Sequence, residues 1–415
     1  MEIIDYPTEL DIIFDTLKKS GIKPILVGGY VRDKLLNEES KDIDIELYGV
    51  SSLDKVEEIL QKFGAINSVG KSFAVCKLKF EGYELDFSLP RKDNKTKSGH
   101  RGFDIEVYPY LDFKTAASRR DFTINAIGYD VMEKKIVDPF SGREDLKKRV
   151  LRAVDLESFG QDPLRVLRAT QFCARFNLQI KHNLYLICKD MVSKNLLAEL
   201  PKERIFEEIK KLLLKSQKPS IGLNLLNQFG FDFPTKNMFI TDILVKKLTA
   251  NEQTNLVLML AALCYNFKQN DIELFLSKLT NEKELFHRVV SLVETHKKLD
   301  NLNDDYTLYK LATLTNIREL LIFSSSIYST DDNSKMVKKC EDIYKKAEEL
   351  GIIDKKLQPL LMGKDILKLG LHPSPKFSQI LDDAYEAQMH GKFKNYDEAL
   401  LWLKEYIKAL SCQSL

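Results

Sequence analysis

The hydrophobic positions of this chain follow one period in its first third and another in the rest. Up to about residue 140, short apolar runs and alternating polar positions predict strands, separated by segments with helical spacing. From about residue 143 onward the spacing is almost wholly helical. The expected elements are a helix at 7–20, strands at 24–28, 42–48, 73–80, 83–89 and 135–138, and helices through 145–178, 183–215, 220–228 and most of 240–410. The pattern predicts an α+β protein, with a small sheet-containing head followed by a long all-α part.

Composition narrows the class of protein without naming a function. With 44% hydrophobic and 30% charged residues among 415, the chain is an ordinary globular protein of several domains. It has no apolar stretch of membrane-spanning length and an acidic N-terminus, so we expect a cytoplasmic protein with no membrane partner. The six cysteines include no C-x-x-C pair, which argues against a disulfide framework and a zinc site.

Net charge is only +2, so a nucleic-acid partner would have to be held by local basic patches. Two such patches lie at residues 91–101 and 143–152. A charge run more often marks a solvated surface, and that reading stays open for both. The first patch belongs to a polar segment between Leu89 and Thr115, which we expect to be a long loop, either functional or disordered.

Residues 26–46, LVGGYVRDKLLNEESKDIDIE, contain the most informative motif. Successive strand side chains point to opposite faces, so Asp42 and Asp44 share one face about 7 Å apart. Two such carboxylates can hold Mg²⁺, which usually adds substrate phosphates as ligands. Gly28 and Gly29 would let backbone N–H groups approach a triphosphate, and Arg32 would add charge. The alternative is a tight turn beside a solvated edge strand.

Two later segments carry polar side chains of the kind that bind nucleotides. In RRDFTINA (119–126) we expect a helix entered through Asp121: either Asp121 caps it, or Asp121 and Asn125 bind a ribose. On the second reading, Arg119 and Arg120 face the triphosphate. The other segment is QDPLRVLRATQ (161–171).

Asp162 begins a helix on whose face Arg165 and Arg168 follow at intervals of three. If Asp162 and Arg165 both face a base, the acid accepts from an amino group while the guanidinium donates to a ring nitrogen. Cytosine and adenine share that edge, whereas guanine and uracil present the reverse. The alternative is that Asp162 and Pro163 only start the helix.

Together these segments resemble a known family. LVGGYVRDKLL with DIDI, RRDFTINA, DPFSG (138–142), DPLRVLRA and ERIFEEI occur in the order of the five motifs of class II tRNA nucleotidyltransferases and bacterial poly(A) polymerases, in the DNA polymerase β superfamily. The resemblance covers residues 20–215, about half the chain. It implies a DNA polymerase β-like head at 1–142, a helical neck with the base-recognition motif at 143–215, a helical body at 216–350 and a tRNA-binding tail at 351–415.

Carried over position by position, the resemblance implies a role for each motif residue. Asp42 and Asp44 would be the catalytic metal ligands, with Asp86 as a third catalytic carboxylate. The implied nucleotide-binding residues are Gly28, Gly29, Arg32, Arg119, Arg120, Asp121, Asn125, Asp162, Arg165 and Arg168. The chain departs from the family at Gln161, where relatives usually have an acidic residue that braces the following arginine. No histidine is followed by Asp, so we expect no phosphohydrolase activity.

The resemblance implies a Mg²⁺-dependent enzyme that adds CCA to the 3′ end of tRNA, using CTP and then ATP. Poly(A) polymerase is the nearest alternative, although SVGKSFAVCKL (68–78) lacks the paired basic residues associated with that branch. A split activity that adds only A or only CC also stays open. Nucleotidyl transfer to a small molecule and a non-catalytic RNA-binding protein are less favoured alternatives.

Overall fold

The computed structural model describes residues 4–70, 75–95, 103–108, 110–234, 236–302, 304–330, 333–373 and 376–412. It divides into two compact units, Met1–Thr235 and Lys236–Leu415. The finer division into head, neck, body and tail stays a prediction. No helix in the described part of the chain is both long and apolar enough to cross a bilayer.

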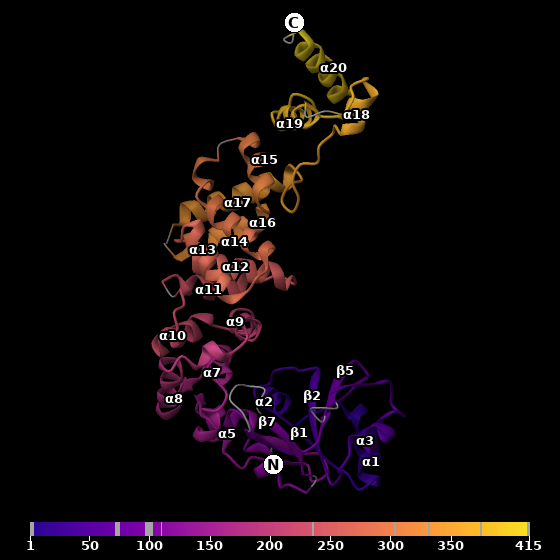
Figure 1. Cartoon of the computed structure of the whole chain (residues 1–415), viewed down its shortest axis with the longest axis vertical. Helices are drawn as coiled ribbons and strands as arrows, with labels where there is room; N and C mark the ends of the chain where they lie inside the picture. The colour runs from indigo at the N-terminus through magenta and orange to yellow at the C-terminus, as the bar shows by residue number, and fades with distance from the viewer. Residues whose placement is uncertain are drawn as a thin grey trace. The chain divides into compact units, whose positions relative to one another are not determined.

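The first unit contains a seven-stranded mixed sheet, of which Figure 1 labels β1, β2 and β5. The strand order is β3-β4-β5-β2-β1-β8-β9. Strands β2 and β5 run parallel, whereas the other neighbours in this sheet are antiparallel. The strands of the sheet are β1 (Lys23–Val27), β2 (Asp42–Tyr48), β3 (Ile66–Gly70), β4 (Val75–Phe80), β5 (Tyr83–Ser88), β8 (Gly128–Asp130) and β9 (Lys135–Val137). The expected sheet head is therefore confirmed.

Helices pack against this sheet and then continue the chain beyond it. Contacts join α1 to β1, α2 to β2 and α3 to β4. The helices of the first unit are α1 (Asp11–Lys19), α2 (Gly29–Leu35), α3 (Leu53–Leu60), α4 (Phe113–Ala117), α5 (Gly142–Lys147), α6 (Leu156–Phe159), α7 (Leu164–Phe176), α8 (His182–Ser193), α9 (Lys202–Lys215) and α10 (Pro219–Phe229). Helices α7, α9 and α10 pack together at the end of this unit.

All regular secondary structure among the described residues of the second unit is helical (Figure 1). Its α-helices are α11 (Met238–Leu244), α12 (Glu252–Cys264), α13 (Gln269–Leu279), α14 (Lys283–His296), α15 (Asp305–Leu314), α16 (Ile317–Thr330), α17 (Ser334–Glu349), α18 (Gly363–Lys368), α19 (Lys376–Met389) and α20 (Tyr396–Cys412). Helix α12 is buried along almost its whole length, whereas α18 to α20 share a smaller core around Ile366, Ile380 and Leu403.

The structure corrects three sequence-based expectations. The segment expected to be a loop contains a hairpin of β6 (Arg91–Lys95) and β7 (Phe103–Val107), and residues 96–102 and 109 lie outside the described residues. The segment expected to be a helix at 119–126 is a 3₁₀ turn, Thr123–Asn125, next to a bridge between Phe122 and Ala153. Within 145–178, two short strands, β10 (Val150–Leu151) and β11 (Gln179–Ile180), pair in parallel. Residues 71–74 of the segment at 68–78 also lie outside the described residues.

The motif DPFSG connects β9 to helix α5, which packs against the 3₁₀ turn Thr123–Asn125. Asp138 accepts hydrogen bonds from the backbone N–H groups of Gly142 (2.7 Å) and Arg143 (2.9 Å), which caps the start of α5. A Cβ at Gly142 would lie only 2.1 Å from the carbonyl oxygen of Thr123. Only glycine therefore lets α5 approach the turn that carries Asn125.

We predict that Gly142→Ala destabilises the first unit by about 3 kcal/mol, the upper end for overpacking, because the colliding partner is backbone. Urea unfolding followed by circular dichroism measures the change, and hydrogen exchange should rise first at residues 121–127. The matched control is Gly363→Ala, where an added Cβ meets no atom within 4 Å. Equal stability of the two variants would contradict the close approach.

Candidate active site

Strand β2 presents its acidic residues on one face of the sheet. Ile43 and Ile45 are buried on the other face, whereas Asp42 and Asp44 are exposed. Within the described residues, neither carboxylate has an ion-pair partner within 4 Å. Asp86 on β5 lies opposite Asp44 in the parallel register, and Lys77 Nζ binds it at 2.6 Å. The structure therefore brings the three predicted carboxylates to neighbouring positions and leaves two of them unpaired.

The charges around Asp44 disfavour a further negative charge. Desolvation by the surrounding protein raises the pKa of Asp44, and repulsion from Asp86 and Asp42 adds to this effect, while Arg120 opposes it. A cation bound between these carboxylates would relieve the repulsion. The charge distribution therefore favours a positively charged ligand beside Asp42 and Asp44.

The donor set fits a hard divalent cation that shares its coordination with a substrate. Among the described residues, no three His, Cys, Asp or Glu side chains group closely enough to hold a metal ion on their own. Mg²⁺ usually keeps several waters and takes one or two carboxylates plus phosphate oxygens. Asp42 and Asp44 supply such an incomplete set, which leaves coordination positions open to a triphosphate.

Gly28 brings the start of α2 directly against Asp44 and Arg120. Its φ of +70° suits glycine, and a Cβ there would lie 2.8 Å from Arg120 Nη1 and 3.2 Å from Asp44 Oδ2. Gly29 has no such requirement, since an added Cβ would meet only Arg32 Nη2 at 3.5 Å. The close approach of backbone, arginine and carboxylate therefore depends on Gly28.

Arg32 is held inside the protein by polar and aromatic contacts. Its guanidinium donates to Asp33 Oδ1 (2.7 Å) and Asn125 Oδ1 (2.6 Å) and lies 4.6 Å from the ring centre of Phe176. Only 4% of the residue is exposed, and burial lowers the pKa of the guanidinium despite the opposing charge of Asp33. A contact between Arg32 and a triphosphate stays a prediction.

Asp121 continues the same hydrogen-bond network toward helix α7. One carboxylate oxygen accepts from Asn125 Nδ2 (3.0 Å) and the other from Arg168 Nε (2.7 Å). Burial would raise the pKa of Asp121, but Arg168 and Asn125 outweigh burial and hold it below its usual range. Asp121 does not cap an α-helix, because the segment that follows is a 3₁₀ turn. Binding of a ribose by Asp121 and Asn125 stays a prediction.

Sequence reasoning did not single out Glu46, the third acid on the same face of β2. It is fully buried, accepts from Tyr48 Oη (2.6 Å) and pairs with Arg119 Nη2 at 3.2 Å. Burial alone would raise its pKa, but the charges of Arg120 and Arg119 and the Tyr48 hydrogen bond hold the pKa of Glu46 below its usual value. The spacing in D-I-D-I-E was the available signal, since residues 42, 44 and 46 alternate onto one face.

Asp162 and Arg165 lie at the start of α7. Asp162 Oδ1 accepts a hydrogen bond from the backbone N–H of Leu164 (3.1 Å). This is the contact expected if Asp162 caps the start of the helix. Arg165 donates from Nη1 to the carbonyl oxygen of Ser158 (3.1 Å) and from Nη2 to that of Arg119 (2.9 Å). Two main-chain carbonyls therefore orient Arg165, and one of them belongs to the same segment as Asp121.

Three parts of the chain match known protein families. Residues 25–152 match the family described as poly A polymerase head domain. Residues 177–232 match a probable RNA and SrmB-binding site of polymerase A, and residues 250–403 match a putative tRNA nucleotidyltransferase domain 2.

Each of two curated relatives matches about half of the chain. The CCA-adding enzyme of Buchnera aphidicola subsp. Schizaphis graminum is 40% identical over 221 residues, which are 51% of this chain and 50% of that protein. The multifunctional CCA protein of Stenotrophomonas maltophilia is 34% identical over 209 residues, 50% of this chain and 49% of that protein. The match thus spans about half the length of these relatives.

Solved structures share the fold over a longer range. The CCA-adding enzyme of Bacillus stearothermophilus in complex with CTP superposes with a TM-score of 0.75 at 21% identity, covering 98% of this chain and 100% of that one. The Thermotoga maritima CCA-adding enzyme complexed with tRNA_CCA gives a TM-score of 0.63 at 19% identity, covering 98% and 100%.

We predict that Glu46→Gln destabilises the first unit by about 3 kcal/mol at neutral pH, because removing this buried carboxylate leaves the charge of two half-buried arginines, Arg119 and Arg120, uncompensated. The pKa of Glu46 is lowered by folding, so its contribution is complete above the unfolded value of about 4.3 and is lost as pH falls through the folded value. Urea unfolding of both proteins between pH 7 and pH 3 measures this difference.

The difference in free energy of unfolding between the unmodified protein and Glu46→Gln should narrow only below about pH 4.3, where Glu46 of the unfolded chain begins to be protonated. A difference that is constant across the whole range would show that Glu46 contributes by shape rather than by charge. Glu84→Gln serves as the control, since Glu84 is exposed and, within the described residues, its ion pair is with Lys79 on the sheet surface.

Proposed function

We propose that this chain is a member of the family of tRNA nucleotidyltransferases and bacterial poly(A) polymerases and adds CCA to the 3′ end of tRNA from CTP and ATP, with release of pyrophosphate. The observation that carries the proposal is the pair of exposed, unpaired carboxylates, Asp42 and Asp44, beside the Gly28 turn. The relatives and solved structures named for CCA addition support the choice of reaction. A tRNA substrate would place the enzyme in the cytoplasm.

Asp42 and Asp44 would hold the catalytic Mg²⁺. When bound, the metal neutralises charge on the triphosphate and activates the terminal 3′-hydroxyl. Arg120, which lies against Gly28 and Asp44, would offer its guanidinium to the phosphates, and Arg119 would add a second positive charge. Glu46, which is buried behind them, would keep both guanidinium groups in place. Asp86, held by Lys77, is proposed as the third carboxylate of this edge.

Asp162 and Arg165 would select the base without a nucleic-acid template. Asp162 uses one oxygen to cap α7, which leaves the other to accept from the amino group of C or A. Arg165, held by two carbonyls, keeps further N–H donors for the ring nitrogen. Its bracing comes from main-chain atoms, so the absence of an acidic residue at Gln161 does not leave Arg165 without support.

The direct test incubates the protein and Mg²⁺ with tRNA that lacks its last three nucleotides, offering CTP, ATP, both or UTP. We expect two C residues from CTP alone, a single terminal A after them and no product from UTP or in the presence of a chelator. Long A tails would assign the protein to poly(A) synthesis instead, and addition of only A or only CC would assign a split activity.

We predict that Asp44→Ala lowers kcat by about a thousandfold or more, because it removes a ligand of the charge-stabilising metal. Filter binding of tRNA should change less than about threefold, since binding rests mainly on phosphate contacts elsewhere. Asp15→Ala, an exposed position on α1, is the control and should match the unmodified protein. Full activity of Asp44→Ala would remove the metal assignment.

We predict that Asp162→Asn loses base selection while keeping α7 intact, because Asn caps helices as well as Asp does but presents a donor as well as an acceptor. The value of kcat/KM for CTP should fall by about tenfold to a hundredfold, as expected for a lost charge-assisted hydrogen bond, while UTP incorporation becomes measurable. Thermal unfolding should be unchanged. If the CTP to UTP ratio stays constant, Asp162 serves only as a helix cap.

A further inference from the structure

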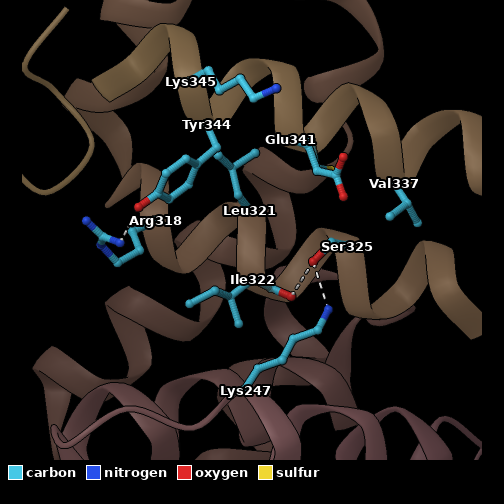
Figure 2. Close-up of a pocket in the computed structure, with 10 residues that line it drawn as sticks. Lys247, Arg318, Leu321, Ile322, Ser325, Val337, Glu341, Tyr344 and Lys345 are labelled. Atoms are coloured by element: carbon cyan, nitrogen blue, oxygen red, sulfur yellow. Dashed lines mark hydrogen bonds between the residues drawn. The ribbon is translucent and has the colours of Figure 1, made fainter. Parts of the chain in front are cut away.

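The second unit contains a cavity of about 400 Å³ that the proposed reaction does not use. It lies between α16 and α17, with one side chain supplied by the 3₁₀ turn Val245–Lys247 (Figure 2). The residues that line it are Lys247, Arg318, Leu321, Ile322, Ser325, Val337, Cys340, Glu341, Tyr344 and Lys345. A volume of this size lies within the usual range for small-molecule sites.

Most of the cavity wall is apolar and fixed in place. Leu321 and Ile322 come from one face of α16, and Val337 comes from α17. Arg318 closes one end as part of the wall: it binds both carboxylate oxygens of Asp354 (2.6 and 2.8 Å) and the hydroxyl of Tyr344 (2.7 Å). Its charge is therefore already balanced and is not offered to a ligand.

Lys247 differs from Arg318 because its charge is not balanced. Its Nζ donates to Ser325 Oγ at 3.0 Å, and within the described residues no carboxylate lies within 4 Å of it. An ammonium group has three donors, so a single hydroxyl leaves it undersatisfied. Burial lowers the pKa of Lys247, which agrees with a charge held away from water. A carboxylate in the cavity would supply the missing partner.

The exposed charges of the cavity wall have opposite signs. Glu341 lines the cavity and is exposed without an ion-pair partner among the described residues, and Lys345 on the same helix also lines it and is exposed. This mixture does not form the basic surface that a strand of phosphates needs. A small monoanion needs only the ammonium group of Lys247 for its charge and the apolar part of the wall for its body.

We propose that this cavity binds a small organic monoanion, a carboxylate with an apolar body, with its carboxylate on Lys247 Nζ and its body against Leu321, Ile322 and Val337. Ser325 Oγ accepts from Lys247 and donates to the carbonyl oxygen of Ile322 (3.2 Å), so it orients the ammonium group rather than the ligand. Neither the family of this chain nor its proposed reaction requires such a site. The cavity therefore makes the second unit a ligand-binding unit in its own right.

The test uses 2-naphthoate as the probe and isothermal titration calorimetry on the full-length protein. We expect saturable 1:1 binding of 2-naphthoate and at least about tenfold weaker binding of the neutral 2-naphthamide, as a lost charge-assisted hydrogen bond implies. Lys247→Met should weaken naphthoate binding by the same factor. Lys246→Met is the matched control, because Lys246 is exposed on the same turn and does not line the cavity.

A second measurement needs no variant: 2-naphthoate should protect Lys247 in the unmodified protein from an amine-reactive label, read by peptide mass spectrometry, while Lys246 stays unprotected. Equal affinity for the acid and the amide, unchanged binding by Lys247→Met, or labelling of Lys247 that the probe does not slow would each overturn the proposal. So would a loss of single-stranded RNA binding in Lys247→Met without any naphthoate binding to the unmodified protein, since Lys247 would then be an RNA contact.

Discussion

The alternation of side chains along β2 is the constraint on which the candidate active site depends. Its apolar residues, among them Ile43 and Ile45, are buried, and this burial holds the register of the strand. A shift by one residue would turn the carboxylates into the core, so the force that holds the strand also places Asp42 and Asp44 on the open face. The same face then changes character within one strand: the first two acids are exposed, and Glu46 is buried against arginines. One face of β2 thus supplies both an exposed pair of carboxylates, Asp42 and Asp44, and the buried carboxylate of Glu46 that balances the neighbouring arginines.

Two further arginines, Arg32 and Arg168, are held by a hydrogen-bond network that joins segments far apart in the sequence. Arg32 on α2 bonds to Asn125, Asn125 bonds to Asp121, and Asp121 bonds to Arg168 on α7. Each member is at least partly buried, where an unpaired charge is costly and a satisfied one is rigid. We therefore expect changes at these four positions to be non-additive, because each removes a partner of the next. The network therefore couples helix α2, which follows the Gly28 turn, to helix α7.

Strong local patterns could be predicted from the sequence, whereas contacts between distant segments could not. Alternation gave the bounds of β2 correctly, but β8 is three buried residues without alternation and was missed. In the segment 119–126, Asp121 looks like the start of a helix, so a helix is expected. The backbone pairs instead with Ala153, about thirty residues away, and nothing in the local sequence indicates this pairing. In the site, the shared face of Asp42 and Asp44 followed from the strand period. The partner of Asp121 did not, since Arg168 lies 47 residues further along the chain.

Main-chain atoms rather than an acidic side chain support Arg165. The sequence resemblance leads us to expect an acidic residue at position 161, but this chain has Gln161, and the guanidinium is held by the carbonyl oxygens of Ser158 and Arg119. A carbonyl is present whatever the side chain, so this orientation depends on the backbone path of two segments rather than on one side chain. That path is set by α6, which ends next to Gly160, and by the bridge between Phe122 and Ala153. Base selection would then be protected against substitution at position 161 and exposed to changes that move either segment.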